Sequence, residues 1–105
     1  MAKVPDKIVK LIDKFIKEAA KDDIHISQAV LFGSYANGTN HKYSDIDLAV
    51  VSEDFDGISF YDNQKLAKAM LRTSIDIEAH PYRPEEFTVA NPFVREIIQS
   101  GIRIL

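Results

Sequence analysis

LFGS at residues 31–34, followed ten residues later by DIDLAVV at residues 45–51, is the stretch that decides the fold of this chain. One apolar run ends in Gly-Ser, and a second begins with two acids, Asp45 and Asp47, two positions apart. Residues i and i+2 of a strand point to the same face, roughly 7 Å apart along the chain. The two carboxylates would therefore lie side by side, which is the arrangement of a cation site and not of a core.

The segments around this stretch alternate between helical and strand patterns, which predicts an α/β fold. Pro81 and Pro84 should end the third strand, because proline cannot donate to a ladder. Asn91 is the expected N-cap of the last helix, and Gly101 its stop. We expect helices over 5–21, 59–72 and 92–99, a helical turn over 34–38, a polar loop over 39–44, and strands over 24–32, 45–51, 74–80 and 102–105. In the helix over 59–72 the side chains expected to face inward are Leu66, Ala67, Met70 and Leu71.

The composition of the chain bounds the class of protein. Its 105 residues, 46% hydrophobic and 28% charged, are typical of one globular domain, expected to span residues 1–105. No apolar run approaches the length of a membrane span and no signal peptide is apparent, so we expect a cytosolic protein without a membrane partner. A net charge of -3 gives no bulk attraction to nucleic acid. Without cysteine, a metal must be held by oxygen or imidazole, and oxygen favours magnesium or manganese.

Three polar features carry the candidate chemistry. Gly33 and Ser34 stand at a strand-to-helix junction, where the backbone can approach a ligand and free amides favour an anion such as a triphosphate. Asp45 and Asp47 can bridge divalent cations that bind phosphate oxygens. Asp76 lies between two isoleucines of the third predicted strand, so three carboxylates meet on one face if the second and third strands pair. Without cations, that cluster of like charge would be costly.

The central motif resembles the signature of the minimal nucleotidyltransferases of the DNA polymerase β superfamily. That signature is Gly-Ser, ten residues, then Asp-x-Asp, and residues 33–47 match it without a gap. The segment 75–77 resembles the family's third carboxylate strand, and 92–102 resembles its C-terminal helix and strand. The similarity therefore covers nearly the whole chain.

The resemblance implies a small mixed β-sheet flanked by helices and a magnesium-dependent transfer of a nucleoside monophosphate to an acceptor hydroxyl, with release of pyrophosphate. The expected donor is an NTP, with ATP the family's usual choice, bound with two Mg²⁺ ions. By position, Gly33 and Ser34 would hold the β and γ phosphates. Asp45 and Asp47 would ligate both metals, and Asp76 would ligate the metal that activates the acceptor. Two cations about 3.5–4 Å apart can stabilise both the attacking and leaving oxygens.

Two positions leave alternatives open. Many relatives carry arginine where this chain has Asn37, so a phosphate contact expected there is in question. Glu78 lies one strand step beyond Asp76 on the same face and could share or take the third ligand role. We prefer Asp76 because it is nearer the strand start, as Asp45 and Asp47 are.

The resemblance also implies a partner. Relatives of this size are commonly encoded beside a small HEPN ribonuclease-like toxin, and act on it by adenylylation or by forming a complex. An interaction module that neutralises a HEPN partner through binding is therefore the rival to the enzyme. The acceptor would come from a partner chain, an oligomer of this chain or a free substrate.

The remaining polar residues have simpler interpretations. Five lysines between Lys7 and Lys21 are expected to form a solvated helix face. The three histidines lack metal-ligand spacing, and only His80 has some weight, because it continues the face of Asp76 and Glu78. Tyr82 and Arg83 could contact a base or an acceptor phosphate, but a rigid loop is the commoner role.

Overall fold

The computed structural model describes residues 4–41 and 44–105. Residues 42 and 43 of the expected polar loop lie outside the described part, as do residues 1–3. The elements, in chain order, are α1 (Asp6–Lys21), β1 (Gln28–Phe32), α2 (Ser34–Asn37), β2 (Ile46–Val51), α3 (Ser59–Thr73), β3 (Ile77–Tyr82), the 3-10 turn η1 (Pro84–Glu86), α4 (Pro92–Ser100) and β4 (Ile102–Arg103).

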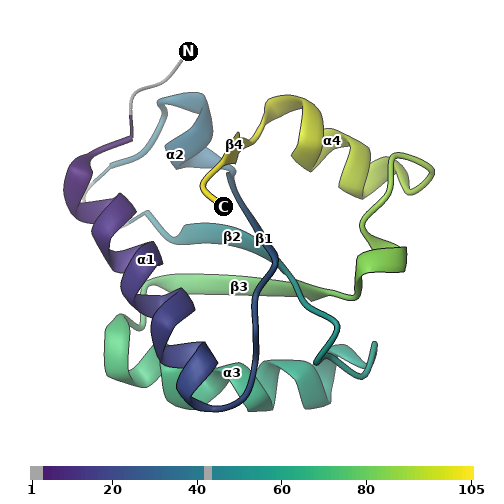
Figure 1. Cartoon of the computed structure of the whole chain (residues 1–105). Coiled ribbons are helices and arrows are strands. Elements are labelled where there is room, and N and C mark those ends of the chain that lie inside the picture. Colours follow the sequence, from purple (N-terminus) through teal and green to yellow (C-terminus); the bar gives the residue numbers. More distant parts are fainter. Residues whose placement is uncertain (1–3, 42–43) are drawn as a thin grey trace.

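The described strands form one four-stranded mixed sheet in the order β3-β2-β1-β4 (Figure 1). β1 runs antiparallel to both β2 and β4, whereas β2 and β3 are parallel. A parallel neighbour needs a crossover, and α3 supplies it between β2 and β3. The mixed sheet flanked by helices is therefore confirmed, and the pairing of the second and third strands on which the carboxylate face depends is present.

The helices cover the two faces of the sheet. The apolar side chains of α1 recur at three- and four-residue steps, so they form one stripe that packs with α3 over one face. α4 covers the other face through Val94 and Ile97, which pack against Val30 and Ala49 (Figure 1). Strand alternation therefore places Leu48 under α1 and α3, and Ala49 under α4.

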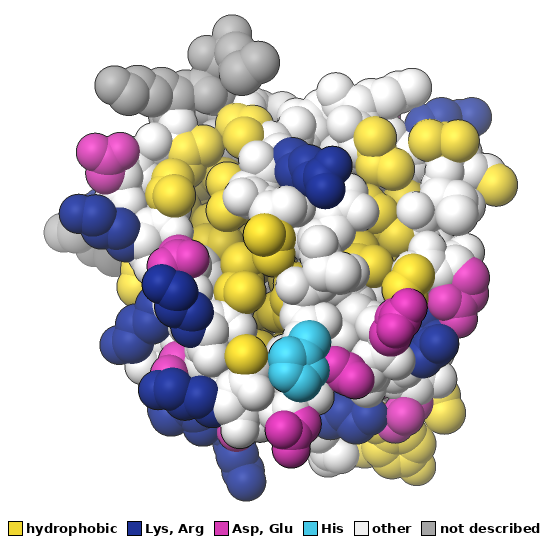
Figure 2. Space-filling view, in the orientation of Figure 1, with side chains coloured by type: hydrophobic (Ala, Val, Ile, Leu, Met, Phe, Trp, Pro, Cys, Tyr) yellow, Lys and Arg dark blue, Asp and Glu magenta, His cyan; other side chains and the backbone are white. Residues whose placement is uncertain are grey.

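The lysines of α1 form the solvated face that the sequence predicts. Lys7, Lys10, Lys14, Lys17 and Lys21 are all exposed. Figure 2 shows dark-blue side chains along the side of the molecule where α1 lies. Two of them pair along the helix, Lys17 with Asp13 at 2.8 Å and Lys21 with Glu18 at 2.6 Å. In the described ranges, no helix combines the length and apolar character needed to cross a membrane.

Part of the predicted pattern around α3 is wrong. Leu66 is buried and Ala67 and Met70 are half-buried, but Leu71 is 69% exposed. The buried stripe of α3 passes through Leu66 and Ala69, and a residue two positions further along a helix points away from it. Ile75, expected on the core face of the third strand, is 77% exposed in the turn that precedes β3.

The strand limits also differ from the sequence prediction. β3 begins at Ile77 and continues through Pro81, which was expected to break it. β3 is an edge strand and meets only β2 in the described sheet, so a residue without an N–H is tolerated within it. The first strand begins at Gln28, although Ile24 and Ile26 are buried before it. Those two isoleucines contribute to the core from the segment that connects α1 to β1.

Candidate metal and nucleotide site

Asp47 lies at the centre of the polar end of the sheet. It pairs with Phe32 of β1 on one side and Glu78 of β3 on the other. Paired residues of adjacent strands point to the same face, so the Asp47 and Glu78 carboxylates lie side by side. His80, two residues beyond Glu78, faces the same way. One ligand atom from each of these three side chains lies within 4.8 Å of the other two.

The His80 imidazole is held against this carboxylate pair. Its Nε2 lies 3.6 Å from Asp47 Oδ1 and 3.9 Å from Glu78 Oε1. Both separations are longer than a hydrogen bond, and Nε2 is buried without a hydrogen-bond partner among the described residues. The ring packs edge-on to Phe32 at 5.0 Å between centroids, and Phe32 packs edge-on to Phe93 of α4 at 6.4 Å. Aromatic contacts from β1 and α4 therefore set the position of the imidazole.

Gly33 brings the backbone directly against the Asp47 carboxylate. Its φ of +74° belongs to the region that glycine alone adopts readily. A Cβ at this position would lie 2.5 Å from Asp47 Oδ2, which is closer than nonbonded atoms approach. The sequence predicts that the Gly33 backbone lies close to a ligand. In the structure this backbone lies close to Asp47, the acid that is expected to bind the metal of that ligand.

Ser34 opens α2 immediately after Gly33. The Ala36 and Asn37 amides donate to the Gly33 carbonyl at 3.1 and 3.0 Å, which forms the expected helical turn. The amides of Ser34 and Tyr35 precede these bonds, at the helix start where amides have no intrahelical acceptor. The turn ends at Gly38, the last residue of the predicted turn, and this glycine adopts a left-handed conformation. Asn37 is exposed on this turn, and its relation to a phosphate stays a prediction.

Asp45 and Asp76 lie one step before the paired parts of β2 and β3. The Ile46 amide donates to the Asp76 carbonyl at 2.8 Å, so the two acids are adjacent across the start of the ladder. Both side chains are exposed, and with Glu78 they line a hollow between β3 and α3. Neither belongs to the close group of Asp47, Glu78 and His80. The structure thus forms two levels of polar side chains: the exposed Asp45 and Asp76 at the strand starts and, one step inside, the half-buried Asp47 and His80 beside the exposed Glu78.

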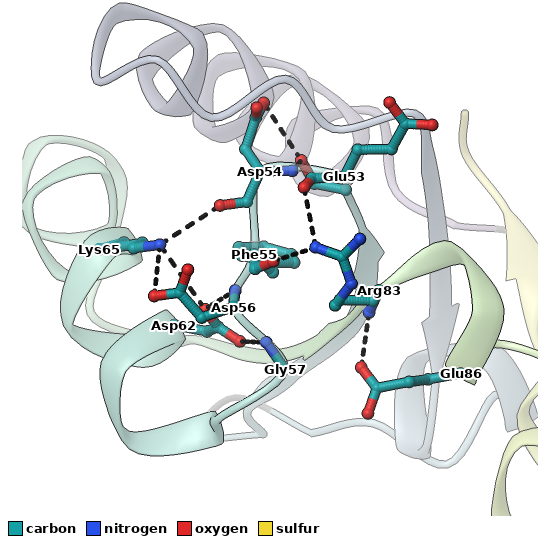
Figure 3. Close-up of polar contacts among 10 residues, drawn as sticks. Glu53, Asp54, Phe55, Asp56, Gly57, Asp62, Lys65, Arg83 and Glu86 are labelled. Atoms are coloured by element: carbon teal, nitrogen blue, oxygen red, sulfur yellow. Dashed lines mark hydrogen bonds and ion pairs between the residues drawn. The ribbon is translucent and has the colours of Figure 1, made fainter.

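Tyr82 and Arg83 serve the packing of the fold. Tyr82 packs against Phe87 with 5.3 Å between ring centroids, and burial, followed by the charge of Glu86, raises the pKa of its phenol. The Arg83 guanidinium donates to the backbone carbonyls of Glu53 and Phe55 (Figure 3). These contacts support the rigid-loop interpretation of this segment.

The loop between β2 and α3 is also held by a buried acid. Asp62 is 2% exposed and accepts hydrogen bonds from the amides of Asp56 at 2.7 Å and Gly57 at 3.0 Å (Figure 3). Lys65 joins the same loop through Asp56 Oδ2 at 2.9 Å. Asp62 therefore has a structural role, because it holds the loop between β2 and α3 against α3. No pattern in the sequence indicated this role.

Two solved structures share this arrangement of helices and strands. A putative nucleotidyltransferase from Sulfolobus solfataricus superposes with a TM-score of 0.62 at 17% identity, over 92% of this chain and 78% of that one. A crystal structure of a toxin-antitoxin with AMP-PNP superposes with a TM-score of 0.60 at 25% identity, over 89% of this chain and 71% of that one. The fold is therefore that of nucleotidyltransferase domains.

Sequence comparison assigns the family. The nucleotidyltransferase domain family model matches residues 12–105, so the chain belongs to that family. A protein adenylyltransferase, MntA of Shewanella oneidensis, is 43% identical over 68 residues, which cover 62% of this chain and 43% of the relative. The chain thus spans less than half the length of that curated relative. The similarity to a minimal nucleotidyltransferase that the motif indicated is confirmed.

Proposed function

We propose that this chain transfers a nucleoside monophosphate, AMP from ATP, to a hydroxyl of a protein acceptor and releases pyrophosphate. The observation that carries the proposal is the junction of Gly33 with Asp47, where a strand-to-helix turn lies against a carboxylate that is paired with a second acid on β3. The similarity to the adenylyltransferase MntA supports AMP as the transferred group and a protein as the acceptor.

The donor set suits divalent cations. Carboxylate oxygens from Asp45 and Asp47, with Asp76 or Glu78 beside them, are ligands that Mg²⁺ accepts. Two Mg²⁺ ions bound there would neutralise the phosphate oxygens and lower the pKa of the acceptor hydroxyl. Asp47 supports this assignment through its position, since its carboxylate lies between the α2 turn and β3.

The chain's own residues would position the donor and receive a proton. Gly33 and Ser34 would seat the β and γ phosphates at the start of α2, where the free amides favour an anion. The acceptor oxygen forms a bond to the α phosphorus as the bond from that phosphorus to the pyrophosphate oxygen breaks. The proton of the acceptor hydroxyl passes to a carboxylate, for which we propose Asp76. The half-buried Asp47 beside the turn would keep the reacting groups in line.

Mutation can decide whether Asp76 or Glu78 is the third carboxylate. Asp76 neighbours Asp45 at the exposed strand starts, and Glu78 neighbours Asp47 one step inside. Asp76→Asn should abolish turnover at saturating ATP if Asp76 receives the proton, and Glu78→Gln should then leave measurable activity. The reverse outcome would assign the role to Glu78.

A toxin is the proposed acceptor. One similar solved structure is of a toxin-antitoxin with AMP-PNP, which supports a toxin partner and an adenine nucleotide here. We propose that the partner is a HEPN-domain protein and that the reaction takes place in the cytosol, where ATP is abundant. Neutralisation through complex formation alone is the second candidate, supported by the same structural relative.

One incubation separates these functions. The chain is mixed with ATP labelled at the α phosphate, Mg²⁺ and the proposed HEPN-domain partner, and covalent label is followed on a denaturing gel. Label should appear on the partner with the wild-type chain and with Asp13→Asn, an exposed acid of α1 that serves as the matched control. It should be absent with Asp47→Asn. Label that survives Asp47→Asn would overturn the mechanism, and a tight complex without any label would support neutralisation through binding.

A further inference from the structure

His80 has a feature that the nucleotidyl transfer proposed above does not use. Within the described ranges 4–41 and 44–105, its Nε2 is buried without a hydrogen-bond partner, although it faces two carboxylates. A buried ring nitrogen normally has a partner. A partner that accepts lone pairs from one imidazole and two carboxylates at once is a metal ion.

The distances suit shared ligands better than a hydrogen bond. Metal bonds to nitrogen and oxygen are about 2.0–2.2 Å long, so two ligand atoms on one ion lie about 3–4 Å apart. Nε2 is 3.6 Å from Asp47 Oδ1 and 3.9 Å from Glu78 Oε1, within that range. A hydrogen bond from Nε2 to either oxygen would need a separation near 3 Å.

The surroundings hold the imidazole in this position. Phe32 contacts the ring edge-on, and His80 is paired across the ladder with Ala49, whose small side chain leaves room for the ring. Because Phe32 in turn contacts Phe93, the ring is held from the α4 side of the sheet. A ligand fixed by packing loses little freedom when it binds an ion.

We propose that His80 Nε2, together with Asp47 and Glu78, is a direct ligand of a divalent transition-metal ion, so that the chain binds Mn²⁺ more tightly than Mg²⁺. An imidazole ligand favours transition metals over magnesium, which prefers an all-oxygen shell. This inference rests on the proposed function, in which Asp47 binds the metal ions that accompany the nucleotide.

The test uses Mn²⁺ alone, without nucleotide. Pulsed electron paramagnetic resonance detects the ¹⁴N coupling of an imidazole nitrogen bound to Mn²⁺. The wild-type chain and His25→Gln should show this coupling, and His80→Gln should lose it. His25 is the matched control because its ring contacts Asp54 in another part of the fold. His80→Gln should also weaken Mn²⁺ binding by about tenfold or more, because even substitutions of residues that only contact a metal ligand weaken binding by about that factor. Mg²⁺ binding should change by less than about threefold.

The design remains decisive if His80→Gln fails to fold. In the wild-type chain labelled with ¹⁵N-histidine, a ¹⁵N signal should replace the ¹⁴N signal, and it should persist in His25→Gln and in His41→Gln, which leaves His80 of the three histidines as its source. Absence of histidine coupling in the Mn²⁺-loaded wild-type chain, or coupling that survives His80→Gln, would overturn the inference. Because no nucleotide is present, this result is independent of AMP transfer, and either proposal can fail alone.

Discussion

Replacing Gly33 with alanine should weaken metal binding at the proposed site more than it destabilises the fold. The added Cβ would lie 2.5 Å from Asp47 Oδ2, so the carboxylate must move or the turn must shift. The backbone at Gly33, with φ +74° and ψ -147°, lies close to a region that only glycine populates freely. A non-glycine residue held there costs about 1–3 kcal/mol.

The magnitudes of the two effects can be estimated separately. A backbone cost of about 2 kcal/mol would lower the melting temperature of a chain of this size by roughly 10 °C. Displacement of the Asp47 carboxylate, a proposed metal ligand, would weaken metal binding directly. Changes one shell further out weaken metal binding by about 10–100-fold, so loss of this ligand's position should weaken it by at least tenfold.

Gly57 provides the matched control. It also has a positive φ, +86°, but the nearest atom to an added Cβ is Arg83 Cδ at 3.4 Å, an ordinary contact. Gly57→Ala should therefore lower the melting temperature by a similar amount while Mn²⁺ affinity and AMP transfer stay close to wild type. Calorimetric Mn²⁺ titration and thermal unfolding of both variants would measure this. If Gly33→Ala bound Mn²⁺ like the wild-type chain, or Gly57→Ala lost as much affinity, the role assigned to Gly33 would be refuted.

Three further predictions concern the fold. Asp62→Ala leaves two buried loop amides without an acceptor, so we expect a loss of about 2–4 kcal/mol in urea unfolding, with Asp62→Asn losing less. Asn91 accepts from two amides at the start of α4, and Asn91→Ala should lose about 1 kcal/mol in urea unfolding, most of which Asn91→Ser should restore. Hydrogen bonds from Lys21, and then from Arg72, hold the pKa of Glu18 below its ordinary value of 4.5. The stabilisation of the folded state by the ionised Glu18 is therefore fully present above pH 4.5 and is lost as the pH falls through the lowered pKa. Thermal melts between pH 3 and 6 should show a weaker pH dependence of the melting temperature for Arg72→Ala than for the wild-type chain.

Much of the fold could be predicted because its signals are local. α1 follows from apolar residues at three- and four-residue steps, and α4 from the Asn91 cap with Pro92 at the first helical position. β2 begins within one residue of its predicted start because alternation and the adjacent loop define it. The local pattern failed to predict where β3 ends. β3 is an edge strand, which the sequence does not reveal, and this position allows Pro81 within the strand.

The residue types of the candidate site could be predicted from the sequence, but which of these residues lie next to each other could not. Alternation places Asp47, Asp76 and Glu78 on one face, but the register of β2 against β3 decides which acid lies beside Asp47. That register depends on where α3 ends and how the following turn is built. The burial of His80 Nε2 could not be foreseen either, because it depends on packing with Phe32, from a strand far away in the sequence.

The most direct test of nucleotidyl transfer compares ATP labelled at the α phosphate with ATP labelled at the γ phosphate. Both are incubated with the chain, the proposed HEPN partner and either Mg²⁺ or Mn²⁺, and the covalent product and the released phosphates are separated. The account predicts label on the partner from the α position only, with the γ label recovered as pyrophosphate. Label transferred to the partner from the γ position, or α label recovered entirely as free AMP, would contradict it.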